Sequence, residues 1–114
     1  MNIFENYLSK INKVILENKA NLNLTILENL NNVSLEVPPN HFNYDLSSNI
    51  SLVLAKTNKL NPINLAEDIK DLLLKKINHF EKIDIAGPGF LNIKLSKNGF
   101  IDNIKDIFRN KDNY

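Results

Sequence analysis

The chain has 114 residues, of which 43% are hydrophobic and 24% charged, and its formal net charge is +1. These values are typical of one soluble globular domain, which at this length needs no disulfide or metal ion to fold. The absence of cysteine excludes disulfides and thiolate metal sites, and the small net charge argues against a stand-alone nucleic-acid binder, which usually carries a strong basic excess.

The sequence shows no signal for a membrane or for secretion. No apolar run approaches the roughly 18 residues that a helix needs to cross a bilayer. The amino terminus, Met1 to Asn6, lacks the basic start and the apolar block of a signal peptide. We therefore expect a cytoplasmic protein without a membrane partner, and we separately expect it to be a monomer.

The first third of the sequence predicts a helix and then one or two strands. Apolar residues recur at three- and four-residue spacing over 2–18, which is typical of an amphipathic helix. Alternating polar and apolar residues over 33–37 predict a half-buried strand, and the two prolines that follow end it. Between these elements, three apolar residues alternate well enough for a short strand: Leu22, Leu24 and Ile26.

The middle of the sequence predicts a loop over 40–44 and two helices. Asp45 is a candidate N-cap for a helix over about 46–58. Asn61-Pro62 is a stronger start signal, because a capping side chain precedes a proline at the first helical position. The helix that follows has acidic residues in its first turn and lysines in its last, which suits the helix dipole.

The last third predicts two strands and a final helix. The strands cover 82–85 and 90–95, and the segment 86–89, with two glycines and a proline, joins them tightly. Ser96 can cap a last helix, which leaves a domain over 1–110 and a linker over 111–114. We therefore predict an α+β fold: a small, mostly antiparallel sheet of three or four strands with about four helices on one face, in the order α-β(β)-α-α-β-β-α.

No constellation of catalytic or metal-binding residues is evident. His41 and His79 lie in different elements and are expected to be exposed or capping side chains. The turn at Gly87 to Gly89 leads into a strand, which argues against a phosphate loop. Asp45 is expected to cap a helix, and Glu36 is expected to lie on the polar face of a strand. Neither is expected to belong to a catalytic acid–base pair. The chain by itself is therefore expected to be non-catalytic, with no metal site.

Phe90 and Asn92 are the strongest candidates for a binding site. They are two residues apart in a strand, so their side chains point to the same face, while Leu91 and Ile93 point to the core. A ring beside a carboxamide suits one unpaired base, which the ring stacks on and the amide hydrogen-bonds. The alternative is an ordinary surface phenylalanine covered by a neighbouring loop.

Several blocks of the sequence resemble the amino-terminal domain of arginyl-tRNA synthetases. The segment 86–93, AGPGFLNI, resembles the Ala-Gly-Pro-Gly-Phe-Ile-Asn strand of that family. The segments 36–39 and 45–49 resemble its Glu-x-Pro and Gly-Asp-Tyr-Ser-Thr-Asn blocks, and 52–56 and 61–67 also agree in order and spacing. Two positions depart from the family pattern. Tyr44 replaces the usual glycine, and Leu46 replaces the usual aromatic residue.

The resemblance, which covers about 33–100, implies a tRNA-binding role. In the family this domain packs on the outer corner of the tRNA and reads a base of the D-loop. These roles would fall on Phe90 for stacking and Asn92 for hydrogen bonding, with Gly87 as a nearby turn position. The full-length protein would attach arginine to tRNA(Arg) with ATP and Mg²⁺ on a catalytic domain of the same chain, while this fragment would hold no cofactor.

Two other classes of function stay open from the sequence. One is a free-standing protein-interaction module of the same α+β fold, in which the Phe90 face docks a protein. The other is a regulatory domain of a different enzyme.

Overall fold

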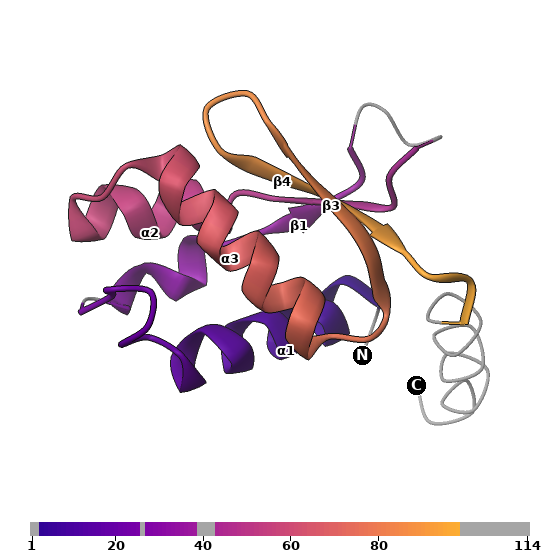
Figure 1. Ribbon diagram of the computed structural model, residues 1–114, viewed down its shortest axis with the longest axis horizontal. Helices are drawn as coiled ribbons and strands as arrows, with labels where there is room; N and C mark the ends of the chain where they lie inside the picture. The colour runs from indigo at the N-terminus through magenta and orange to yellow at the C-terminus, as the bar shows by residue number, and fades with distance from the viewer. Residues whose placement is uncertain (1–2, 26, 39–42, 99–114) are drawn as a thin grey trace.

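The computed structural model describes residues 3–25, 27–38 and 43–98 of the chain (Figure 1). Their elements follow in the order α1, a 3₁₀ helix η1 (Glu28–Asn32), β1, β2, α2, α3, β3 and β4. The predicted α+β class and antiparallel sheet are confirmed. The predicted last helix and linker, the loop position His41 and the apolar residue Ile26 lie outside the described residues.

The four described strands form one antiparallel sheet in the spatial order β1-β2-β4-β3. β3 (Phe80–Ala86) and β4 (Phe90–Leu95) form a hairpin, as predicted, and β4 begins and ends where the sequence pattern indicates. β2 (Leu46–Ser48) pairs with the other edge of β4, and β1 (Leu35–Glu36) lies outside β2. Because β4 has a paired neighbour on both sides, the direction of each of its side chains is fixed.

Three helices cover one face of the sheet (Figure 1): α1 (Ile3–Glu17), α2 (Ile50–Asn58) and α3 (Pro62–Lys76). α3 begins where the Asn-Pro signal predicts. Because it begins at Pro62, its first turn contains no acidic residue, contrary to expectation, whereas its last turn contains the expected lysines. The Asn61 side chain accepts hydrogen bonds from the backbone N–H groups of Ile63 and Asn64, each at 3.0 Å. None of the described helices is long and apolar enough to cross a bilayer.

One hydrophobic core fills the space between these helices and the sheet. From β4 it contains the residues predicted to face inward, since Leu91 and Ile93 are fully buried and Leu95 is nearly so. The helices contribute the other large part of it: Tyr7, Ile11 and Ile15 from α1, Ile50 and Leu54 from α2, and Leu65, Ile69 and Leu73 from α3. Among the described residues, the helix side of the sheet is therefore filled by the core, whereas the exposed side chains of β4 lie on the opposite side.

The short strand considered at Leu22 and Leu24 is absent from the described part of the chain. Both side chains are buried, so the alternation correctly indicates burial of every second residue. Their backbone N–H groups, however, donate to the nearby carbonyls of Asn18 and Lys19. The segment is a series of local turns, so of the one or two strands expected before residue 38 only the second forms in the described part of the chain.

The helix predicted over 46–58 begins later than expected, because its first three residues form β2. Asp45 does not cap this helix. Its carboxylate accepts a hydrogen bond from the Leu95 N–H at 2.8 Å, and its own N–H donates to the Ile93 carbonyl at 2.8 Å. These bonds hold the segment against β4, and this tertiary pairing overrides the local helix signal.

Candidate nucleic-acid interface

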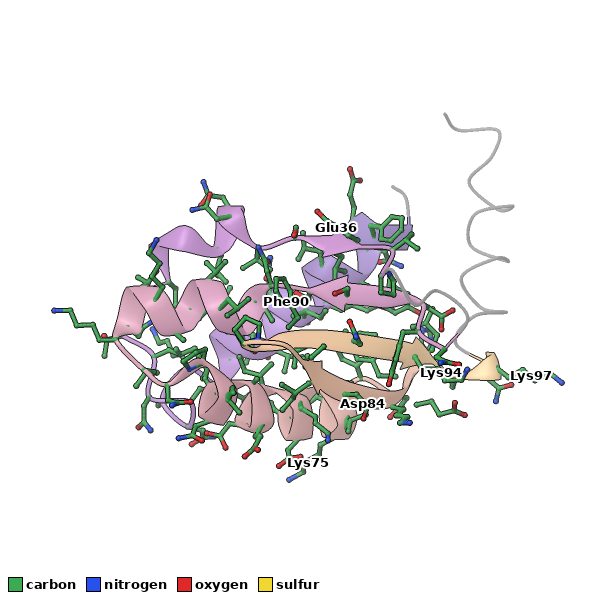
Figure 2. The ribbon with its side chains drawn as sticks, turned by 90° about the horizontal axis from the view of Figure 1, so that it is seen from above. Glu36, Lys75, Asp84, Phe90, Lys94 and Lys97 are labelled. Carbon is green, nitrogen blue, oxygen red and sulfur yellow. The ribbon has the colours of Figure 1, made fainter. Side chains whose placement is uncertain are left out.

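The sheet face turned away from the helices carries Phe90, which Figure 2 labels, and the register places Asn92 on the same face. The Phe90 side chain is 39% exposed at the start of β4, and Asn92 is partly exposed on the same face. Leu91, between them, is fully buried on the other face. The structure therefore brings the ring and the carboxamide together on an accessible surface.

The register of the sheet places Asn92 in the middle of a polar row that crosses all four strands. Asn92 lies opposite Ser47 of β2 and opposite Asp84 of β3, and Glu36 of β1 lies opposite Ser47. No described residue hydrogen-bonds the Asn92 carboxamide within the fold. Within the described part of the chain, the donor and the acceptor of this amide therefore have no partner.

Phe90 lies beside this polar row, two residues from Asn92 along β4 and next to the turn between β3 and β4. Its register partner on β3 is Ala86, whose methyl side chain leaves room beside the ring. Lys94 (Figure 2), near the other end of β4, lies opposite Lys82 in the register of the sheet. The face thus offers an aromatic ring, then a polar row, then a pair of lysines.

The turn that precedes Phe90 requires its glycines and fixes the position of the ring. The Gly89 N–H donates to the Ala86 carbonyl at 3.3 Å, and φ is +55° at Gly87 and +144° at Gly89, values that glycine adopts without strain. A Cβ on Gly89 would come within 3.3 Å of Pro62, so the turn packs against the start of α3. A Cβ on Gly87 would lie 3.9 Å from the Phe90 ring, which places this glycine beside the candidate stacking surface.

Tyr44 and Asp84 form a contact across the same face that was not predicted. The Tyr44 hydroxyl donates a hydrogen bond to Asp84 Oδ2, and Lys82 Nζ lies 3.3 Å from the same oxygen. The hydrogen bond to Asp84 raises the pKa of Tyr44, and the same bond lowers the pKa of Asp84. At neutral pH the pair therefore consists of a neutral phenol and a charged carboxylate.

Part of this arrangement had a signal in the sequence. A three-residue turn at 87–89 implies that Ala86 faces Phe90, and counting back along the hairpin places Asp84 opposite Asn92. Nothing comparable indicates Tyr44, whose partner lies 40 residues away in the sequence. Contacts of this kind depend on the strand order of the whole sheet.

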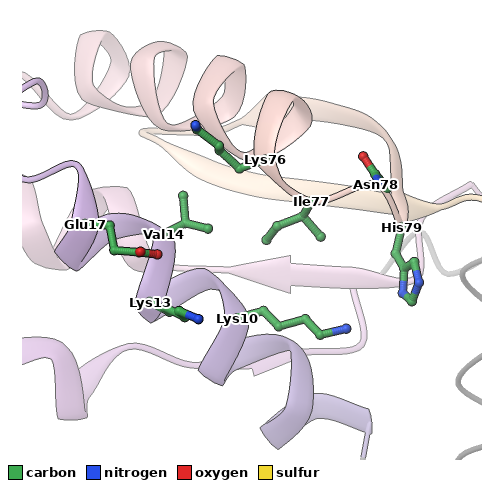
Figure 3. A pocket seen from close by; sticks show the side chains of 8 residues that line it. All are labelled: Lys10, Lys13, Val14, Glu17, Lys76, Ile77, Asn78 and His79. Carbon is green, nitrogen blue, oxygen red and sulfur yellow. The ribbon is translucent and has the colours of Figure 1, made fainter.

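A separate hollow of about 390 Å³ lies on the helix side of the molecule, between α1 and the end of α3 (Figure 3). It is at the end of β3 opposite to the Gly87–Gly89 turn, so it is not part of the Phe90 face. His79 borders it, and its Nδ1 lies 3.0 Å from the buried Tyr7 hydroxyl. The expectation that His79 is exposed or capping is met only in part, because the side chain is partly exposed but its imidazole pairs with a buried phenol.

Comparison with known proteins agrees with the resemblance seen in the sequence. The family described as the arginyl tRNA synthetase N terminal domain matches residues 4–95. Arginine–tRNA ligase of Pelagibacter ubique is 38% identical over 116 residues, which cover 100% of this chain and 20% of the relative. The enzyme of Bartonella quintana is also 38% identical, over 100% of the chain and 19% of the relative. That of Mesoplasma florum is 44% identical over 66% of the chain and 13% of the relative. The chain thus spans about a fifth or less of the length of these enzymes.

Proposed function

The chain belongs to the family of arginyl-tRNA synthetase amino-terminal domains, and on this basis we propose that its exposed sheet face binds the D-loop at the outer corner of tRNA(Arg). The protein that carries it is then an arginine–tRNA ligase. Arginine activation with ATP and Mg²⁺ belongs to the remaining four fifths of such an enzyme, where the catalytic domain lies. This domain supplies a contact that orients the tRNA.

The observation that carries the proposal is that the Phe90 ring and the Asn92 carboxamide lie side by side on the accessible face of β4. The ring provides a flat apolar surface on which an unpaired base can stack. The carboxamide, two residues away, can donate to and accept from the edge of the same base. Because β4 is paired on both sides and the preceding turn packs against Pro62, both groups are held in place before the RNA arrives.

The charge of the domain supports a contributory role and not independent binding. The net charge is +1, whereas tight nucleic-acid binders neutralise many phosphates. One stacked base stabilises a complex by about 1–3 kcal/mol. A weak contact of this kind still raises the overall affinity for tRNA when the same enzyme makes a second tRNA contact elsewhere. Once one contact has formed, the other forms within the same complex.

We expect Asn92→Ala in the full-length enzyme to raise the KM for tRNA(Arg) by about five- to tenfold, since a base edge would lose its hydrogen-bond partner, an effect of about 1–3 kcal/mol for a good pair. Steady-state aminoacylation measures this KM. Arginine-dependent ATP–pyrophosphate exchange at saturating tRNA(Arg) should be unchanged, because the proposed role of Asn92 is in tRNA binding and not in the chemical step.

Asn78→Ala provides the matched control for this variant. Asn78 is an exposed amide in the turn after α3, beside the hollow on the helix side, and its loss should leave tRNA kinetics unchanged. Equal kinetics for wild type and Asn92→Ala would remove Asn92 from the interface. An equal rise in both variants would mean that the sheet face has no special role.

A further inference from the structure

The side chain of Tyr44 crosses the binding face above β4. The Asp45 N–H donates to the Ile93 carbonyl at 2.8 Å, so the backbone just before β2 still follows the edge of β4. The hydroxyl of Tyr44 reaches Asp84, which belongs to β3. Because β4 lies between β2 and β3 in the sheet, this side chain can only reach its partner by passing over β4.

The register shows at which level of β4 this crossing occurs. Asp84, where the hydroxyl ends, lies opposite Asn92. The backbone of Tyr44 lies beyond the Leu46–Ile93 pair, towards the carboxyl end of β4. The ring therefore passes over β4 on the Lys94 side of Asn92, and Phe90 lies on the other side.

Asn92 is thus flanked by two aromatic side chains on one face of the sheet. Alternate residues of a strand are about 6.8 Å apart, so Phe90 stands about that far from Asn92 along β4. A planar base that stands upright above Asn92 has one π-face turned towards the Phe90 ring. Its other π-face is turned towards the Lys94 side of β4, where the Tyr44 ring crosses the strand. Stacking on aromatic side chains is a common way to hold an unpaired base.

We infer that Tyr44 forms the second wall of the base site, so that one unpaired nucleobase lies between the rings of Tyr44 and Phe90 with Asn92 at its edge. This inference rests on the function proposed above and adds a residue to the same site. The Tyr44 hydroxyl donates its hydrogen bond to Asp84 Oδ2, and Lys82 Nζ lies 3.3 Å from the same oxygen. Tyr44 therefore presents its ring, while recognition of the base edge belongs to Asn92.

The tether to Asp84 fixes the ring before the base binds. A tyrosine held at its hydroxyl loses less side-chain freedom on binding than an untethered one, which favours affinity. The neutral phenol and the Lys82 partner also reduce the repulsion that the Asp84 carboxylate would exert on a nearby phosphate. Tyr44→Phe keeps the ring and removes the tether, whereas Tyr44→Leu removes both.

The test is the aminoacylation kinetics of the full-length enzyme with these two variants. We expect Tyr44→Leu to raise the KM for tRNA(Arg) by about five- to tenfold through lost stacking, with kcat and arginine activation unchanged. Tyr44→Phe should raise it by no more than about threefold. Leu16→Ala, which shortens an exposed apolar side chain on α1, is the control and should match wild type. A KM for Tyr44→Leu that equals or falls below that of wild type would overturn the inference. The Tyr44 ring would then either make no contact with the base or block access to the site.

A scan of abasic positions in the D-loop separates this inference from the proposed function. If both rings hold one base, the penalties of Tyr44→Leu and Phe90→Ala should disappear together when the tRNA lacks that one base. Should the Phe90 penalty disappear at one position while the Tyr44 penalty persists there, Tyr44 does not share the site and only the further inference fails. If no abasic position affects either variant, the proposed D-loop contact fails as well.

Discussion

Replacing Phe90 by alanine is expected to raise the KM for tRNA(Arg) by about tenfold or more in the enzyme that carries this domain. The ring is 39% exposed on the sheet face and provides the stacking surface of the proposed site. Loss of base stacking costs about 1–3 kcal/mol, and each 1.4 kcal/mol corresponds to a factor of ten in binding. Aminoacylation at varied tRNA concentration measures the change.

Two controls show whether this effect arises at the RNA contact. Arginine-dependent ATP–pyrophosphate exchange, measured at saturating tRNA(Arg), should be unchanged in Phe90→Ala, because the proposed role of the ring is in tRNA binding alone. Phe90→Tyr keeps an aromatic surface and should stay within about threefold of wild type, because a tyrosine ring also stacks on a base. Unchanged tRNA kinetics in Phe90→Ala would exclude the ring from the interface. A loss of arginine activation would indicate damage to the fold.

Replacing the next residue, Leu91, by alanine should affect stability. Its side chain is fully buried in the core between the sheet and the helices. Truncation of a buried leucine removes apolar contacts and leaves a cavity, which lowers the free energy of unfolding by about 2–5 kcal/mol. Urea denaturation of the 114-residue chain measures this loss.

The comparison of Leu91→Ala with Phe90→Ala tests the two faces of β4. Phe90→Ala should lower the free energy of unfolding by less than about 1 kcal/mol, in the range of substitutions outside the core. Leu91 would then contribute mainly to the stability of the fold, and its neighbour Phe90 mainly to the proposed RNA contact. Equal losses of stability in the two variants would show that the Phe90 ring also belongs to the core, and the proposed binding face would lose its basis.

Features with a local cause were predictable from the sequence. Asn61 caps α3 because its side chain and the following proline suit the first turn of a helix. The strand β4 has the predicted bounds because its alternation begins after a turn that requires glycine at positions 87 and 89. The Phe90–Asn92 pairing follows from the same alternation, so the candidate site could be located before the structure was known.

Features that depend on distant pairing were not predictable in the same way. The residues 46–48 form a strand because β4 binds them, and Asp45 finds its partner 50 residues away, at the N–H of Leu95. Tyr44 acquires its place on the proposed binding face only because the order of the strands puts β4 beneath it. The sequence alone shows which residues alternate, and the sheet order decides which of them meet.

The most direct measurement of the central claim is photo-crosslinking from position 90. A benzophenone side chain placed there in the full-length enzyme, bound to tRNA(Arg) and irradiated, should attach to a single nucleotide of the D-loop. The same group placed at Leu16 on α1, away from the sheet face, should give no crosslink. A crosslink from position 90 to the anticodon or acceptor arm, or none at all while tRNA is bound, would contradict the proposed contact between this face and the D-loop.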